Sequence, residues 1–340
     1  MPGTVTHADW RVSWSIPTGW GGGLVISKAA FRNDMVLYKG TIPFVLVPYH
    51  GGSPMFKDGI NNLGAPFTPV LPTSANDSWG LGTPPAGNDN EWSPGNPTGA
   101  VVVEREPGNL LEPARLVIWA KLQCANYQYV HRWTFHADGT IEVSVGLGGH
   151  LWTTSTLVSD HVHTFYVRLD FDMVGSGNNA VQEFAHTNNN PGADVWTTIT
   201  TEGRRIADRN TATKWRVVNK TPKPNGKLRS YELTPGSDMG PDNVSSTGDL
   251  WVLRYDGSQD GAAVGKTDAA LHTTYLHGPG TVVDGADVVV WVALRHHHET
   301  RQQGEETITL PYEFLSMHIE PRDFLNATPT NLYSTTPPSP

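Results

Sequence analysis

Alternation of apolar and polar side chains with a period of two recurs along this chain and predicts β-strands. From residue 127 to residue 135, aromatic and histidine side chains occupy every second position, and Ile141, Val143 and Val145 resume the alternation after Asp138-Gly139. An Asp-Gly pair between two alternating runs is typical of a tight turn. The segment 127–145 therefore predicts a long β-hairpin.

Two further segments show how the predicted strands are buried. Residues 161–172 again alternate, which separates two sets of side chains onto opposite faces. Residues 288–294 are continuously apolar, as in a strand that is covered on both faces. One face of 161–172 carries His161, His163, Phe165, Val167, Leu169 and Phe171, and the other carries Arg168, Asp170 and Asp172.

The remaining pattern favours an all-β fold. Helical periodicity is nearly absent, and no internal repeat of fixed period occurs, which argues against a solenoid or a propeller. We predict one large antiparallel β-sandwich domain over residues 1–340, with a core of about 8–330. Further strands are predicted at 41–49, 114–121, 215–219 and 250–255, a long surface loop at 66–97, and a frayed tail at 333–340.

Composition and charge exclude several classes of function. The 35 glycines and 26 prolines disfavour helical folds, and a net charge of -9 without a basic cluster argues against nucleic-acid binding. The longest apolar run, 288–294, is too short to span a membrane, and residues 1–10 lack the pattern of an export signal. We therefore expect a cytoplasmic protein without nucleic-acid or membrane partners. One cysteine, Cys124, excludes an internal disulfide and any multi-cysteine metal site.

Histidines remain as candidate metal ligands. His161 and His163 lie two apart on one strand face, where two imidazoles can point at a single ion. His296, His297 and His298 follow the buried strand and offer a third ligand. All-imidazole ligation suits Cu(II), Zn(II) or Ni(II), and the residues alone do not choose among them. The alternative is a polar strand face and a polar loop without metal.

Several motifs in order resemble the catalytic domain of the copper-containing amine oxidases, whose topaquinone cofactor forms from one of the protein's own tyrosines. The resemblance covers nearly the whole chain and implies that family's large β-sandwich, or supersandwich. The motifs are 23–26 with 30–32, Val47-Pro48-Tyr49, Asn126-Tyr127-Gln128-Tyr129 with Trp133 and 138–141, His161-x-His163 with 168–170, 249–255, and 287–291 followed by His298-x-x-Arg301.

The resemblance implies a role for each matching residue. His161, His163 and His298 are the copper ligands, which leaves His296 and His297 beside the ligands or on the surface. Tyr127 becomes the topaquinone, Tyr49 hydrogen-bonds the mature ring, and Asn126 packs over it and limits its rotation. An aspartate removes the α-proton of a primary amine, which leaves as an aldehyde while dioxygen becomes hydrogen peroxide.

Two further properties follow from the same resemblance. Asp170 and Asp287 occupy positions where the family binds a peripheral calcium-like ion, and hard cations prefer such oxygen ligands. Surface aspartates at strand ends are the alternative. Association as a homodimer is also implied.

Some positions depart from the family pattern. Asp58 matches the catalytic base only if the preceding loop is shortened, since an ungapped count reaches Leu63. A buried carboxylate at 58 would need a raised pKa to work near neutrality. Gln128 replaces the acidic residue that normally follows the cofactor tyrosine. By strand parity we also expect Cys124 to face away from Tyr127, as a buried, inert thiol.

These departures keep two alternatives open. The first is a copper-binding enzyme of the same fold that lacks the quinone and acts on a specialised metabolite. The second is a non-catalytic β-sandwich that binds sugar or protein through its 12 Trp and 10 Tyr residues, with structural histidines. The substrate itself cannot be read from the residues.

Overall fold

The computed structural model is built from strands. It describes residues 2–17, 23–48, 55–59, 65–70, 101–125, 127–150, 161–185, 195–207, 213–235, 248–257, 277–278, 280–298 and 307–325. Within these ranges there is no α-helix, and none of the described segments forms a helix long and apolar enough to cross a membrane. The expected lack of helices is therefore confirmed for the described residues.

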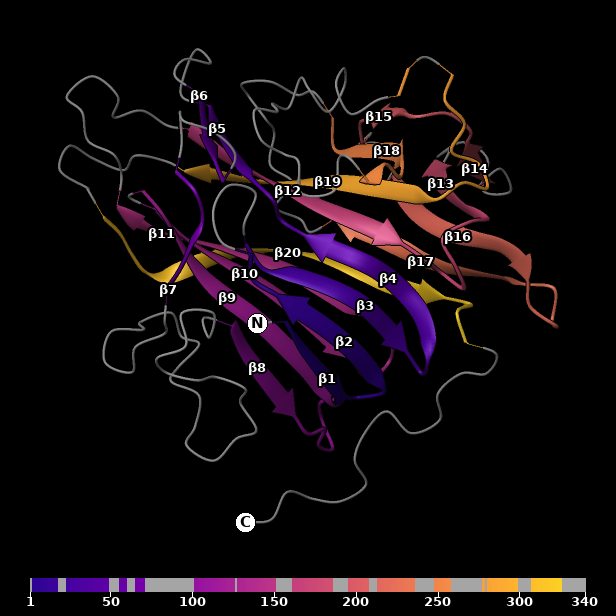
Figure 1. The fold of residues 1–340 in the computed structure, drawn as a ribbon, viewed down its shortest axis with the longest axis horizontal. Helices are drawn as coiled ribbons and strands as arrows, with labels where there is room; N and C mark the ends of the chain where they lie inside the picture. Colours follow the sequence, from indigo (N-terminus) through magenta and orange to yellow (C-terminus); the bar gives the residue numbers. More distant parts are fainter. Residues whose placement is uncertain are drawn as a thin grey trace.

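The first of two sheets has ten antiparallel strands and contains the predicted strand at 161–172 (Figure 1). Its order is β1 (Gly3–His7), β2 (Trp10–Ser15), β3 (Val25–Phe31), β4 (Asp34–Thr41), β12 (His161–Phe171), β19 (Val288–His298), β18 (Leu250–Arg254) and β15 (Gly203–Arg205). Near one end of β12, β5 (Val45–Pro48) pairs with β12, and β6 (Met55–Asp58) pairs with β5.

The second sheet also has ten antiparallel strands and contains the predicted hairpin. Its order is β14 (Val195–Ile199), β13 (Asn179–Ala185), β16 (Lys214–Pro222), β17 (Leu228–Pro235), β20 (Thr307–Arg322), β11 (Ile141–His150), β10 (Tyr127–His136), β9 (Arg115–Cys124) and β7 (Thr68–Val70), with β8 (Val101–Glu106) also on β9. The two sheets form the predicted β-sandwich.

The alternation that predicted the strands also fills the core. Phe165 and Val167 of β12 join one buried cluster with Tyr129 and Trp133 of β10, so the inner faces of the two sheets share a core. The opposite face of β12 packs Tyr166 into a second buried cluster with residues of β5, β18 and β19. The prediction that 288–294 is covered on both faces is confirmed, because its alternate residues belong to these two clusters.

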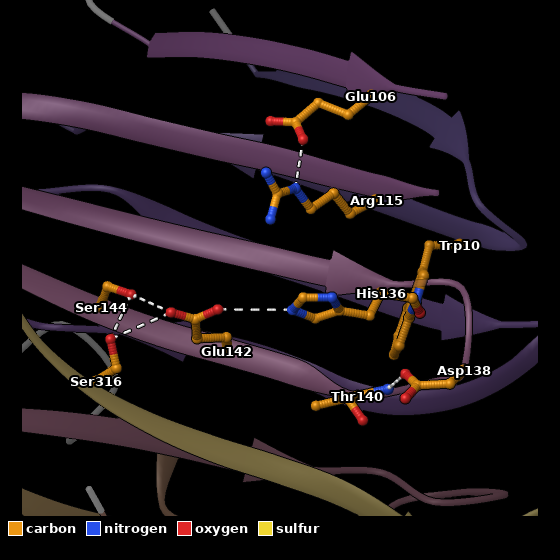
Figure 2. A network of polar contacts seen from close by, with 9 residues as sticks. All are labelled: Trp10, Glu106, Arg115, His136, Asp138, Thr140, Glu142, Ser144 and Ser316. Carbon is orange, nitrogen blue, oxygen red and sulfur yellow. Dashed lines mark hydrogen bonds and ion pairs between the residues drawn. The ribbon is translucent and has the colours of Figure 1, made fainter. Parts of the chain in front are cut away.

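On the face of the second sheet that points away from the first, polar side chains of the β10–β11 hairpin and of β20 contact one another (Figure 2). Glu142 accepts hydrogen bonds from Ser144 and Ser316 at 2.9 and 3.2 Å and lies 3.6 Å from His136. These contacts, with that to His136 the largest cause, lower the pKa of Glu142 to about 2. Trp10 Nε1 donates to the carbonyl of His136 at 2.8 Å, which ties β2 of the first sheet to the hairpin.

The structure corrects one prediction and adds strands that the pattern did not indicate. The segment 66–97 was expected to be a surface loop, but residues 68–70 form β7 and pair with β9. Three residues with a central proline carry too little alternation to indicate a strand. The rest of that loop, like the tail 333–340, lies outside the described residues. Strands β1, β2, β4, β6, β8, β13–β15, β17 and β20 were also not predicted.

Candidate metal centre

Strand register brings three histidines together between the sheets. In the antiparallel pair of β12 and β19, His161 lies directly opposite His298. Residues opposite each other in such a pair project from the same face, and His163 joins them two positions along β12. Nε2 of His161 lies 3.1 Å from Nε2 of His163 and 3.1 Å from Nδ1 of His298. The structure thus places the three predicted copper ligands in one group.

The spacing of these nitrogens suits one small ion. Imidazole nitrogens bound to a single transition metal at about 2.0–2.1 Å lie roughly 3 Å apart when the angles at the metal are near 100°. A neutral imidazole carries only one N–H, so Nε2 of His161 can donate to at most one of its neighbours. Such a convergence of ring nitrogens fits a shared cation better than a set of mutual hydrogen bonds.

The protonation of His163 also favours metal binding. His163 is fully buried, and this burial, followed by the nearby His161, His298 and His296, holds its pKa well below the usual range. The ring is therefore neutral near pH 7, the form in which imidazole binds a metal.

Tyr127 reaches the same point from the opposite sheet. Its hydroxyl lies 3.1 Å from Nε2 of His161, and its ring meets the ring of His163 edge-on at 4.8 Å between centroids. The side chain is 6% exposed, so the phenol is held in the buried end of the sandwich. An ion bound by the three histidines would therefore lie beside the hydroxyl of Tyr127.

Asp58 is connected to the histidines and Tyr127 by a hydrogen bond from Tyr129. Tyr129 donates a hydrogen bond of 2.6 Å to Oδ2 of Asp58, and its ring stacks near that of Tyr127 at 6.1 Å between centroids. Asp58 is 4% exposed at the end of β6. Burial raises its pKa to about 6, although the hydrogen bond from Tyr129 acts in the opposite direction. The structure thus puts Asp58 close to the tyrosine strand and gives it the raised pKa that a buried base would need.

Tyr129 is the residue of this site whose importance the sequence analysis missed. Besides its bond to Asp58, its hydroxyl oxygen lies 3.3 Å from Nδ1 of His163. Strand parity contained the signal, because residues 127 and 129 share one face of a strand. The contact with Asp58 was not foreseeable in this way, since 71 residues separate the two.

The expected placement of Cys124 is wrong. Cys124 ends β9 and lies directly opposite Tyr127 across a two-residue connection, so the two side chains share a face. The parity argument failed because it treated residues 124 and 127 as one strand, whereas the chain reverses between them. The thiol is buried and donates to the carbonyl of Ala65 at 3.1 Å. Burial, followed by the charge of Asp58, raises its pKa, which agrees with an inert thiol.

The other predicted residues of the site are only partly placed. Tyr49 and Asn126 lie outside the described residues. His297 is exposed, while His296 is half-buried opposite His163 in the register. Neither of these two belongs to the group whose nitrogens converge.

An acidic cluster lies at the far end of β12. Asp170, Asp172 and Asp287 each offer a carboxylate oxygen within 4.8 Å of the others. Arg168 lies 3.6 Å from Oδ2 of Asp170, and Oδ1 of Asp287 is buried without a hydrogen-bond partner. Burial, with the charge of Asp287 second, raises the pKa of Asp172 to about 6. Asp170 and Asp287 are the two predicted cation ligands, and Asp172, the third member of the cluster, was not predicted.

Comparison with known proteins relates both the sequence and the fold to amine oxidases. Over 96% of its length the chain is 25% identical to a primary amine oxidase of Arthrobacter sp. (strain P1), and it covers 60% of that relative. It is 24% identical to a primary amine oxidase of Klebsiella aerogenes over 91% of its length, covering 50% of that protein. The chain thus spans between half and two thirds of these relatives.

Solved structures agree on the fold. A copper-containing benzylamine oxidase from Hansenula polymorpha matches with a TM-score of 0.72 at 17% identity, over 96% of this chain and 60% of that one. The amine oxidase of Aspergillus nidulans matches with a TM-score of 0.67 at 17% identity, over 94% of this chain and 52% of that one. At this identity the likeness supports the architecture alone.

The family model for the copper amine oxidase enzyme domain matches residues 104–338, which include β9–β20 and all three converging histidines. With more than half of its length matched, the chain belongs to the copper amine oxidase family.

Proposed function

We propose that the protein is a copper-dependent oxidase that converts a primary amine, dioxygen and water into an aldehyde, ammonia and hydrogen peroxide, with Tyr127 as the precursor of topaquinone. The observation that carries the proposal is the position of the Tyr127 hydroxyl, 3.1 Å from Nε2 of His161 in the group of three imidazoles. A phenol to be oxidised by dioxygen at a copper ion must lie next to that ion.

The relatives support the substrate class. One Arthrobacter relative is named a copper methylamine oxidase, and one structural relative is named a benzylamine oxidase. Both names refer to primary amines. Because the chain covers 60% of each of these proteins, we propose the class of substrate and no individual amine. A homodimer, as the family resemblance implies, is part of the same proposal.

In this proposal His161 and His163 bind copper through Nε2 and His298 binds it through Nδ1. Copper, together with the quinone formed from Tyr127, would supply the electrophile for the amine and the route for electrons to dioxygen. The three ligands come from β12 and β19 of one sheet and the phenol comes from β10 of the other. Packing of the two sheets therefore fixes the phenol relative to the ligands.

Asp58 is the proposed base that accepts the α-proton of the bound amine at a carboxylate oxygen. A pKa of about 6 leaves the carboxylate mostly ionised at pH 7, while a proton taken from substrate is still held well enough to lower the barrier. The hydroxyl of Tyr129 donates to Oδ2 and so helps to hold the carboxylate in place. The buried setting also keeps bulk water from this carboxylate.

Reconstitution with Cu(II) in air tests the proposal. The metal-free protein should gain the pink colour of a quinone and react with phenylhydrazine, whereas Tyr127→Phe should bind copper and show neither response. Tyr231→Phe is a matched control, because Tyr231 is also buried and its hydroxyl bonds only the carbonyl of Gly139 at 3.1 Å among the described contacts. Copper binding without colour in the wild type would favour the enzyme without a quinone, and no copper binding would favour the non-catalytic module.

Asp58→Asn tests the proposed base separately. This variant should form the quinone normally, because asparagine still offers the Tyr129 hydroxyl an acceptor oxygen and residue 58 makes no described contact with Tyr127 or the converging nitrogens, but turnover should fall by about 10²–10⁴-fold. Asp9→Asn, which changes an exposed carboxylate paired with Arg32, should leave turnover unchanged. Normal turnover in Asp58→Asn would remove Asp58 from the mechanism.

A further inference from the structure

Tyr129 connects two parts of the proposed site that come from different elements. Its hydroxyl lies 2.6 Å from Oδ2 of Asp58 on β6 and 3.3 Å from Nδ1 of His163 on β12. All three side chains are buried, with exposures of 0% for Tyr129, 4% for Asp58 and 0% for His163. Within this buried group the direction of each hydrogen bond is decided by which atoms carry a proton.

Counting protons fixes those directions. A tyrosine hydroxyl has one hydrogen to donate, and the shorter contact, to the carboxylate of Asp58, takes it. The Tyr129 oxygen can then only accept from His163, so Nδ1 of His163 must carry the proton. A neutral imidazole with its proton on Nδ1 has a free lone pair on Nε2. Nε2 is the nitrogen of His163 that lies 3.1 Å from Nε2 of His161 in the candidate metal centre.

We propose that Tyr129 is a positioning residue that holds His163 in the Nδ1–H tautomer and at the same time fixes the carboxylate of Asp58. This inference rests on the proposed function, because it assumes that the three histidines bind copper. It adds that the base and one metal ligand are oriented by the same hydroxyl. A substitution of Asp58 therefore alters which nitrogen of His163 carries the proton, and a substitution of His163 alters the hydrogen bonding of Asp58, because both contact the Tyr129 hydroxyl.

A comparison within the molecule separates this role from ordinary core packing. Tyr231 is as buried as Tyr129, but its hydroxyl donates to a backbone carbonyl, that of Gly139, at 3.1 Å. Its removal costs a hydrogen bond without affecting which nitrogen of a histidine carries a proton. Tyr129→Phe and Tyr231→Phe therefore remove the same atom from two buried tyrosines and differ in what that atom touches.

Copper affinity provides the first test. The metal-free wild type and both variants are loaded with Cu(II) under argon, so that no quinone forms, and the dissociation constant is measured by competition with a chromophoric chelator. Tyr129→Phe should bind Cu(II) about 10–100-fold more weakly, as expected when the outer hydrogen bond of a ligating histidine is lost. Its Cu(II) EPR spectrum should also change, while Tyr231→Phe should match the wild type in both measurements.

The tautomer can be read directly in the metal-free protein. Two-bond ¹H–¹⁵N correlations of histidine-labelled protein distinguish Nδ1–H from Nε2–H, with His163 assigned by comparison with His163→Gln. The expected result is Nδ1–H in the wild type and a shift toward Nε2–H in Tyr129→Phe. If Tyr129→Phe does not fold, Asp58→Leu replaces it, because the freed hydroxyl of Tyr129 would then donate to Nδ1 and push the proton of His163 to Nε2.

The outcomes distinguish this inference from the proposed function. Unchanged copper affinity and an unchanged tautomer in Tyr129→Phe, or in Asp58→Leu, would overturn the positioning role while copper binding by the wild type still stood. A wild type that binds no Cu(II) would overturn the proposed function and this inference with it. Equal losses of affinity in Tyr129→Phe and Tyr231→Phe would show general damage to the core and would also overturn the positioning role.

Discussion

The two ends of β12 carry opposite kinds of chemistry. At the first end, His161 and His163 point between the sheets and meet His298 of β19. At the other end, Asp170 projects from the opposite face of the strand and meets Asp172 and Asp287. Both groups of three depend on the same antiparallel pairing of β12 with β19, which aligns the strands from His161–His298 to Phe171–Val288.

The histidine group and the acidic group differ in the free-energy cost of burial without a bound cation. Neutral imidazoles lose little when they are desolvated, and the pKa of His163 shows that its ring stays uncharged. Three carboxylates repel one another, and the raised pKa of Asp172 shows the cost of holding charge there. The histidine end suits a transition metal bound by nitrogen, and the acidic end suits a hard cation such as Ca²⁺. The following changes test this contrast, from the largest expected effect to the smallest.

His161→Ala should have the largest effect, because Nε2 of His161 lies at the centre of the imidazole group. We expect Cu(II) affinity to fall by more than about 100-fold, which exceeds the usual loss from an outer hydrogen bond. Competition with a chelator measures the change. His297→Ala, at an exposed position of the same histidine run, should keep wild-type affinity. Loss of copper binding in His297→Ala would show that the assignment of the third ligand is shifted by one residue.

Asp287→Asn should affect the acidic end alone. If the carboxylates bind Ca²⁺, a concentration about 100 times the dissociation constant should stabilise the wild type by about 2.7 kcal/mol, which thermal unfolding reports as a rise in Tm. Asp287→Asn should lose most of that rise and keep its Cu(II) affinity. Asp284→Asn is the control, since Asp284 lies nearby but pairs with Lys220 at 2.9 Å. If Ca²⁺ does not change the Tm of the wild type, the cluster does not bind this cation and consists only of carboxylates that repel one another.

The smallest effect concerns pH. In the folded protein the pKa of Asp172 is about 6, above its ordinary value of 3.8, so between these values the folded state binds more protons than the unfolded state. The contribution of Asp172 to stability therefore falls as pH rises from about 4 to above 6. Without added cation, Asp172→Asn should flatten the unfolding free energy in this range, measured by urea titration at several pH values. An identical pH slope in wild type and variant would contradict the raised pKa.

The sequence predicted those parts of the fold and site that depend on local periodicity. The hairpin at 127–145 and the faces of 161–172 follow from alternation alone, and the structure confirms both. Grouping of His161 with His163 follows from the same parity. The position of His298 needed the family resemblance, because nothing local separates it from His296 and His297.

The rest depended on contacts between residues distant in sequence. Asp58 meets Tyr129 only because β6 is attached through β5 to the end of β12, and no pattern within either segment indicates this. The face of Cys124 was misjudged because the two-residue connection before Tyr127 contains no glycine or proline to mark the reversal. Asp172 shares the predicted face of Asp170, but the family resemblance that singled out Asp170 and Asp287 assigned no role to it.

The length of β12 itself has a consequence for how such chains can vary. Nine positions separate His161 from Asp170, an odd number, so the two side chains project from opposite faces of one strand. One residue inserted between them would rotate one half of the strand relative to the other and leave only one of the two clusters in its present orientation. Insertions and deletions in homologous chains that keep both clusters are therefore expected outside 161–170, or in pairs within it.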